Sequence, residues 1–145
     1  MAWYDDYLDA WTSHDSARIV SFMAPNVTYT DVALGQTHTG RTDIAQWIDS
    51  MVDHFSTDYS FESGPAVATD TGYALEWVMK GTHDRADTDN QLPATGKPFA
   101  IRGVSVGELA DGKITRNTDY WSLTEFLMQV ELMPSPQTAK AGAPG

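Results

Sequence analysis

DGKITRNTDYWSLTEFLMQVEL, residues 111–132, carries the signals of a turn, a strand and a helix in immediate succession. Its opening Asp-Gly pair is a strong signal for a hairpin turn. The β-branched and aromatic residues that follow predict a strand over 113–121, and Ser122 predicts the capped start of a helix over 122–130. Asp119 breaks the pattern, because carboxylates disfavour strands. It either organises the start of the helix or works in a pocket, and Ser122 is the better cap.

In the rest of the chain, hydrophobic spacing predicts three helices in the N-terminal part and a run of strands after them. The first helix is expected over about residues 2–13. The second is expected to begin at Asp15 or Ser16 and to carry Met23, and Pro25-Asn26 should end it. The third is expected along an amphipathic stripe from Ile44 to Phe55. The strands are expected over 27–33, from Tyr59, over 73–83 and over 99–109.

Helices segregated from a mostly antiparallel sheet predict an α+β domain. A strongly curved antiparallel or mixed sheet, wrapped on the three N-terminal helices and followed by the short C-terminal helix, would enclose a cone-shaped pocket.

Strand alternation predicts which side chains face that pocket. On strand 99–109, Gly103, Ser105 and Gly107 remove bulk from one face, either because the strand bends or because a ligand needs room. Each of three other strands has one face that carries polar groups. On strand 27–33 this face is Val27, Tyr29, Asp31 and Ala33, and on strand 73–83 it is Tyr73, Leu75, Trp77, Met79, Gly81 and His83. On strand 113–121 it is Thr115, Asn117, Asp119 and Trp121, with Ile114 on the opposite side.

Length and charge limit the classes of protein. The 145 residues suit one domain, expected over 1–133, and a Pro/Gly/Ala-rich tail at 134–145 is expected to be disordered. A net charge of −11 repels phosphate backbones and anionic lipid, so we expect no nucleic-acid or membrane partner. The acidic N-terminus lacks a signal-peptide pattern, which predicts a cytoplasmic protein. With no Cys and four scattered His, a zinc site has no support in the sequence. A Gly-rich phosphate loop, a nucleophile elbow and a metal-spaced cluster are also missing, so we expect no cofactor.

Five segments together resemble a known family. They are YLDAWTSHD (7–15), VTYTDVALGQTHTGRTDI (27–44), MKGTHDR (79–85), LPATGKP (92–98) and the opening stretch. They resemble the NTF2-like superfamily and, within it, the SnoaL-like polyketide cyclases. The resemblance covers nearly all of the expected domain and implies the cone fold, a homodimer through the outer sheet face, and a cofactor-independent lyase or isomerase. The superfamily also hosts dehydratases, epoxide hydrolases and non-enzymes, so function must be argued from the site.

The resemblance implies roles for individual residues. Asp119 corresponds to the general acid/base of an intramolecular aldol closure, which removes a proton between two carbonyls of a polyketide-like substrate. His83 and Asp31 would support it. Several such cyclases carry a histidine where this chain has Ser105. The expected substrate contacts are hydrogen bonds from Tyr29, Asn117 and Ser105, and apolar walls from Trp47, Trp77, Trp121 and Tyr7.

Two of these acid–base residues have other interpretations. Asp31 also resembles the proton-shuttling aspartate of ketosteroid isomerases, with Tyr7 near the tyrosine of their first helix. Alternatively, Asp31 is a carboxylate at a strand end that hydrogen-bonds loop amides. His83 either transfers or shares a proton in the pocket, or meets solvent where its strand ends.

Two other functions stay open. An epoxide hydrolase of the limonene type would use Asp119 and Tyr29 to activate water, but Arg102 is followed by Val104 where that family has an aspartate. The other alternative is a non-catalytic accessory dimer that binds a small apolar molecule.

Overall fold

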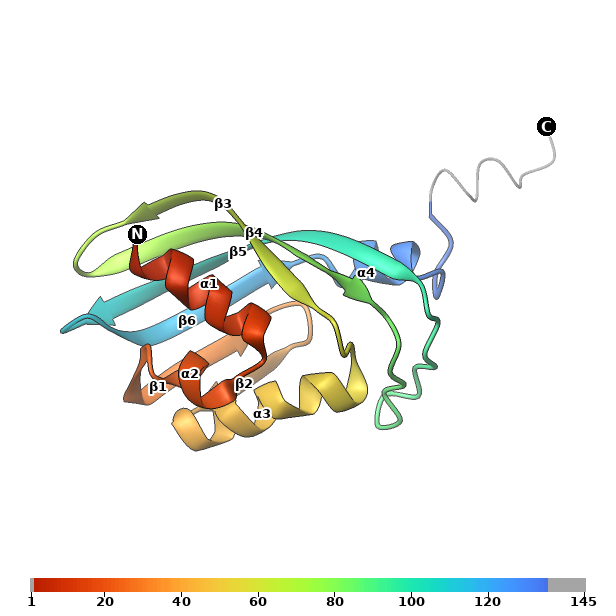
Figure 1. The fold of residues 1–145 in the computed structure, drawn as a ribbon, viewed down its shortest axis with the longest axis horizontal. Coiled ribbons are helices and arrows are strands. Elements are labelled where there is room, and N and C mark those ends of the chain that lie inside the picture. The colour runs from red at the N-terminus through yellow and green to blue at the C-terminus, as the bar shows by residue number, and fades with distance from the viewer. Residues whose placement is uncertain (1, 136–145) are drawn as a thin grey trace.

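The computed structural model describes residues 2–135, so the tail expected to be disordered lies outside the described residues from position 136 onward. The described part folds into four helices and six strands (Figure 1). None of these helices is long and apolar enough to cross a membrane. In chain order the elements are α1 (Trp3–Ser13), α2 (Ser16–Val20), β1 (Met23–Asp31), β2 (Gln36–Thr39), α3 (Arg41–His54), β3 (Ser60–Ala68), β4 (Gly72–Thr82), β5 (Pro98–Ala110), β6 (Lys113–Trp121) and α4 (Leu123–Gln129).

The strands form one mixed sheet in the order β2-β1-β6-β5-β4-β3. Neighbouring strands are antiparallel except β1 and β6, which run parallel. Helix α1 lies across one face of the sheet, and α2 and α3 lie on the same side (Figure 1). Helix α4 begins as expected, because the Ser122 hydroxyl accepts a hydrogen bond from the Glu125 amide. The α+β arrangement predicted from the sequence is confirmed.

The second helix is shorter than expected. It ends at Val20 and the chain enters β1 at Met23, so Pro25-Asn26 lie within a strand and do not end a helix. Met23 is fully buried in the core and pairs with Ile114 of β6. The pairing with β6 shifts between Met23 and Thr28, and such an irregularity accommodates a proline, which has no amide proton for a ladder.

Strand β2 is absent from the sequence-based prediction. Its four residues, Gln36–Thr39, are polar and mostly exposed, and they pair with β1 at the edge of the sheet. A short polar edge strand protects the sheet against pairing with other chains but gives no alternating hydrophobic signal. The hairpin brings Gln36 opposite Asp31, at the end of β1 where the polar site begins.

A bulge in β6 changes which side chains face the core. Glu108 pairs with Arg116, whereas Leu109 pairs with Ile114, so Thr115 is an extra residue in β6. Ile114 is therefore fully buried in the core instead of lying on the opposite face. Thr115 directs its hydroxyl to the carbonyl of Glu108 and does not continue the polar inner face. Simple alternation is wrong for these two residues because it assumes an unbroken strand.

Aromatic rings of β4 fill the space over two glycines of β5. A Cβ atom at Gly103 would lie 2.3 Å from the ring of Trp77, and one at Gly107 would lie 2.3 Å from the hydroxyl of Tyr73. The sequence left open whether these glycines serve a bend or a ligand. In the structure, their missing side chains make room for neighbouring rings.

We predict that Gly103→Ala lowers the free energy of unfolding by about 1–3 kcal/mol, because the Trp77 ring must move to admit the methyl group. Urea denaturation of both proteins measures the loss. Gly72→Ala is the matched control, since its Cβ would meet the nearest atom at 3.2 Å and should cost less. Equal stability of Gly103→Ala and wild type would contradict this packing.

Candidate active site

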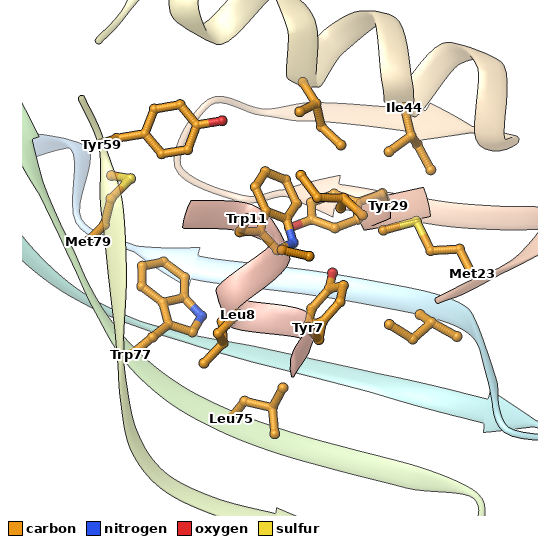
Figure 2. Packing of buried hydrophobic residues seen from close by; sticks show 14 of the residues in the cluster. Tyr7, Leu8, Trp11, Met23, Tyr29, Ile44, Tyr59, Leu75, Trp77 and Met79 are labelled. Carbon is orange, nitrogen blue, oxygen red and sulfur yellow. The ribbon is translucent and has the colours of Figure 1, made fainter. Parts of the chain in front are cut away.

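A cavity of about 250 Å³ lies between the helices and the inner face of the sheet. Figure 2 shows Tyr7 and Trp11 of α1 projecting toward Tyr29 of β1, with Trp77 and Met79 of β4 nearby. Concave, largely apolar sites with few polar groups are typical of small-molecule binding. The aromatic lining is Tyr7, Trp11, Tyr29, Trp47, Phe55, Phe61, Trp77, Trp121 and Phe126. The buried polar lining is Asp31, His83, Ser105 and Asp119.

Asp119 receives hydrogen bonds from three strands. The Ser105 hydroxyl of β5 donates to Oδ1 at 2.6 Å, and the Asn117 amide of β6 donates to the same oxygen at 2.9 Å. The Tyr29 hydroxyl of β1 donates to Oδ2. A carboxylate has about four acceptor positions, so one position on Oδ2 stays free for a ligand. Asp119 as a residue is 7% exposed, so these donors replace most of the water around its carboxylate.

Two further residues orient these donors. The Trp77 indole donates to Ser105 Oγ at 2.9 Å, and the Tyr73 hydroxyl donates to Asn117 Oδ1 at 2.6 Å. An indole can only donate, so Ser105 accepts from it and directs its own proton to Asp119. The bond from Tyr73 likewise turns the NH₂ group of Asn117 toward Asp119. Sequence reasoning missed Tyr73 in this role and treated Trp77 only as a wall, although strand alternation puts both on one face.

Burial dominates the electrostatics of this group. It raises the pKa of Asp119 from 3.8 to about 6, although the bonds from Ser105, Tyr29 and Asn117 oppose the rise. The nearby charge of Asp31 adds to the rise. Burial and the charge of Asp119 raise the pKa of Tyr29 well above its ordinary value, so Tyr29 remains a protonated donor. At neutral pH the site therefore holds a mostly ionised carboxylate with raised basicity.

Asp31 lies beside Asp119, because the two residues are register partners on the parallel strands β1 and β6. Its Oδ1 accepts from the Leu34 amide at 3.0 Å, and its Oδ2 accepts from the Trp121 indole at 3.1 Å. Burial raises the pKa of Asp31. Asp31 thus lines the cavity and also bonds a loop amide, so it combines features of both interpretations from the sequence.

His83 lies in the same cavity but apart from Asp119. It directly follows β4, which ends at Thr82, whereas Ser105, the donor to Asp119, pairs with Leu75 nearer the start of that strand. Its Nδ1 is 3.0 Å from the Thr95 hydroxyl, and its ring packs against Phe126. Within residues 2–135, no hydrogen bond joins His83 to Asp119, so the shared proton expected between them is not seen. Burial lowers the pKa of His83.

The other predicted wall residues also meet at the cavity. Tyr7 is 1% exposed, and its hydroxyl has no hydrogen-bond partner among the described residues. It points toward the rings of Trp11 and Tyr29 (Figure 2). Trp47 of α3 stacks on His38 with ring centroids 4.7 Å apart and lies 5.3 Å from Tyr29. Across residues 2–135, no three His, Asp or Glu side chains are grouped so that they could hold a metal ion.

Comparisons with known proteins identify relatives of this fold. A family model described as the SnoaL-like domain matches residues 4–117. The chain is 27% identical to a candidate polyketide cyclase from Xanthomonas campestris pv. campestris, with 88% of this chain and 93% of that chain covered and a TM-score of 0.74.

Two further solved structures are similar. A protein from Catenulispora acidiphila with a ketosteroid isomerase-like fold, solved in complex with trimethylamine, is 23% identical over 88% of this chain and 91% of that chain, with a TM-score of 0.76. A candidate polyketide cyclase from Pseudomonas putida is 20% identical over 87% and 93%, with a TM-score of 0.71. The described chain thus has the NTF2-like fold that its motifs imply.

We predict that the pKa of Asp119 makes stability depend on pH. The folded state holds this proton more tightly than the unfolded chain, so the added stability is full below pH 3.8 and is lost as pH rises to about 6. Relative to Asp119→Asn, wild type should lose about 3 kcal/mol in total across that window. Urea denaturation at a series of pH values measures the difference. Asp111→Asn, an exposed turn carboxylate, controls for net charge, and a pH-independent difference for Asp119→Asn would contradict the shift.

Proposed function

This chain belongs to the SnoaL-like family, and on that premise we propose that it is a cofactor-independent acid–base enzyme acting on an apolar, polyketide-like carbonyl compound. The reaction is an intramolecular aldol-type cyclisation or an isomerisation. The observation that carries the proposal is the buried carboxylate of Asp119, held by three donors beside an apolar cavity with its pKa raised to about 6. A general base is most effective when its pKa lies near the working pH.

The free position on Oδ2 of Asp119 takes a proton from a carbon next to a carbonyl group. The C–H electron pair becomes an enolate, which attacks a second carbonyl in the cyclisation or is reprotonated at another carbon in the isomerisation. The proton held by Asp119 then passes to the new alkoxide or carbon, and the carboxylate is regenerated. The Tyr7 hydroxyl supports this proposal, because it lines the cavity without a hydrogen bond within 3.5 Å among residues 2–135 and can donate to the substrate oxygen on which charge develops.

The sequence predicts that Ser105 and Asn117 hydrogen-bond the substrate, but we propose a different role for both residues. Their donors are directed at Asp119, so we assign them as positioning residues that hold the base. Asp31 is a second acid beside the base, and it disfavours a second negative charge in the cavity. His83 lines the cavity without a hydrogen bond to Asp119 among residues 2–135, and we assign it to contact with a polar group of the substrate.

The hydrogen bond between Tyr29 and Asp119 also suits activation of water for epoxide opening. The arginine expected in that alternative does not support it, because Arg102 is exposed and pairs with Val78 on the outer side of the sheet. A non-catalytic binding protein would keep ligand affinity without turnover. The experiment below separates these alternatives from the cyclase proposal.

The test is product analysis by mass spectrometry in heavy-oxygen water, with a panel of aromatic β-polycarbonyl esters and cyclic epoxides. We predict unlabelled cyclised product from wild type, and kcat/KM about 10²- to 10⁴-fold lower for Asp119→Asn. The rate should fall below pH 6, because protonation removes the base. Asp111→Asn is the control. A labelled diol would indicate epoxide hydrolysis, and ligand binding without turnover would indicate a binding protein.

We also propose a homodimer formed through the outer face of the sheet. Tyr120 is 49% exposed there, beside Val104, its register partner on β5. Light scattering is predicted to give twice the 15.9 kDa chain mass for wild type and the single mass for Tyr120→Arg. A monomeric wild type would contradict the proposal.

A further inference from the structure

The charges of the cavity have one sign. Four aspartates line it, namely Asp31, Asp87, Asp89 and Asp119, and no lysine or arginine from residues 2–135 does so. Two histidines, His54 and His83, also line the cavity. Burial lowers the pKa of His83, so His83 adds little positive charge at neutral pH. The whole chain carries a net charge of −11. An anionic ligand would therefore be repelled both during approach and after binding.

Among residues 2–135, the ionised Asp119 carboxylate has no partner of opposite charge. Its three hydrogen-bond donors are neutral side chains, and the nearby charge that acts on it most is that of Asp31, which has the same sign. A buried charge without a counter-charge is costly, and the cost falls when a cation enters beside it. The cavity is therefore electrostatically incomplete without a positively charged ligand.

The walls also suit a cation. The rings of Trp11, Trp47, Trp77 and Trp121 line the cavity, and the face of an indole ring attracts ammonium groups more strongly than other side-chain rings do. The Tyr7 hydroxyl is buried and lines the same cavity, close to Trp11 and Tyr29, but it forms no hydrogen bond within 3.5 Å in the part of the chain that the structure describes. A neutral tyrosine oxygen can accept a hydrogen bond from an ammonium N–H or donate one to a carbonyl oxygen.

We propose that the ligand of this cavity is an organic cation, an apolar carbonyl compound that carries a protonated or quaternary amine. The carbonyl part of this statement rests on the proposed function, whereas the preference for a cation rests on the charges and rings of the cavity alone. The charge balance of the proposed reaction agrees with a cationic substrate. When Asp119 takes the carbon-bound proton, the carboxylate becomes neutral and the substrate becomes a zwitterion, so the ammonium group of the substrate offsets the enolate.

Equilibrium dialysis with three matched probes at pH 7.5 tests the preference. The probes are trimethyl(2-naphthylmethyl)ammonium, its uncharged isostere 2-neopentylnaphthalene, and 2-naphthylacetate. We expect wild type to bind the ammonium about tenfold more tightly than the isostere and to bind the acetate most weakly. Asp119→Asn should clearly lower the tenfold preference, while the Kd of the isostere changes less than about twofold. Asp111→Asn, which removes one exposed charge outside the cavity, should keep the preference.

The isostere also reports whether the cavity of each variant is intact. If Asp119→Asn loses the isostere as well, Asp31→Asn becomes the test variant, and it should lower the preference for the cation without losing the isostere. Three results would overturn the proposal: tighter binding of the isostere or the acetate than of the ammonium, an unchanged preference in both cavity variants, and binding of none of the probes. Because these probes cannot react, the outcome is independent of whether Asp119 is a catalytic base.

Discussion

The Asp119 carboxylate can remain buried only while donors from three strands are directed at it. Tyr29 comes from β1, Ser105 from β5 and Asn117 from β6, so the parallel pairing of β1 with β6 and the antiparallel pairing of β5 with β6 are both required. The bonds from Trp77 and Tyr73 extend this network to β4. Four of the six strands are thereby tied to one charged group, and a change in their register would leave it without partners.

The burial of Asp119 and its hydrogen bonds together also set its basicity. Removal from water costs stability when Asp119 is ionised, and that cost appears as raised basicity. The three donors limit the rise, so the carboxylate stays mostly ionised at neutral pH. The neighbouring Asp31 acts in the opposite direction to the donors.

Local patterns were sufficient to predict the strand that carries Asp119, the cap at Ser122 and the aromatic inner face of β4. They could not predict that β1 lies parallel to β6, because Tyr29 and Asp119 are 90 residues apart in the chain. The bulge at Thr115 was also invisible, since alternation assumes regular pairing. For the candidate site, alternation predicted that Asp31 and Asp119 face the pocket, but not that they are register partners. Alternation puts Tyr73 on the inner face of β4, but its hydrogen bond to Asn117 depends on long-range strand pairing and could not be predicted.

Carbon-13 NMR titration of the aspartate carboxyl groups tests the central claim directly. The Asp119 signal is assigned by its disappearance in Asp119→Asn. The account predicts that this carboxyl titrates with a pKa of about 6 and that Asp31→Asn lowers the value, because Asp31 contributes to the rise. A pKa at or below 3.8, unaffected by Asp31→Asn, would contradict the account, since Asp119 would then be a well-solvated or fully compensated acid with no raised basicity.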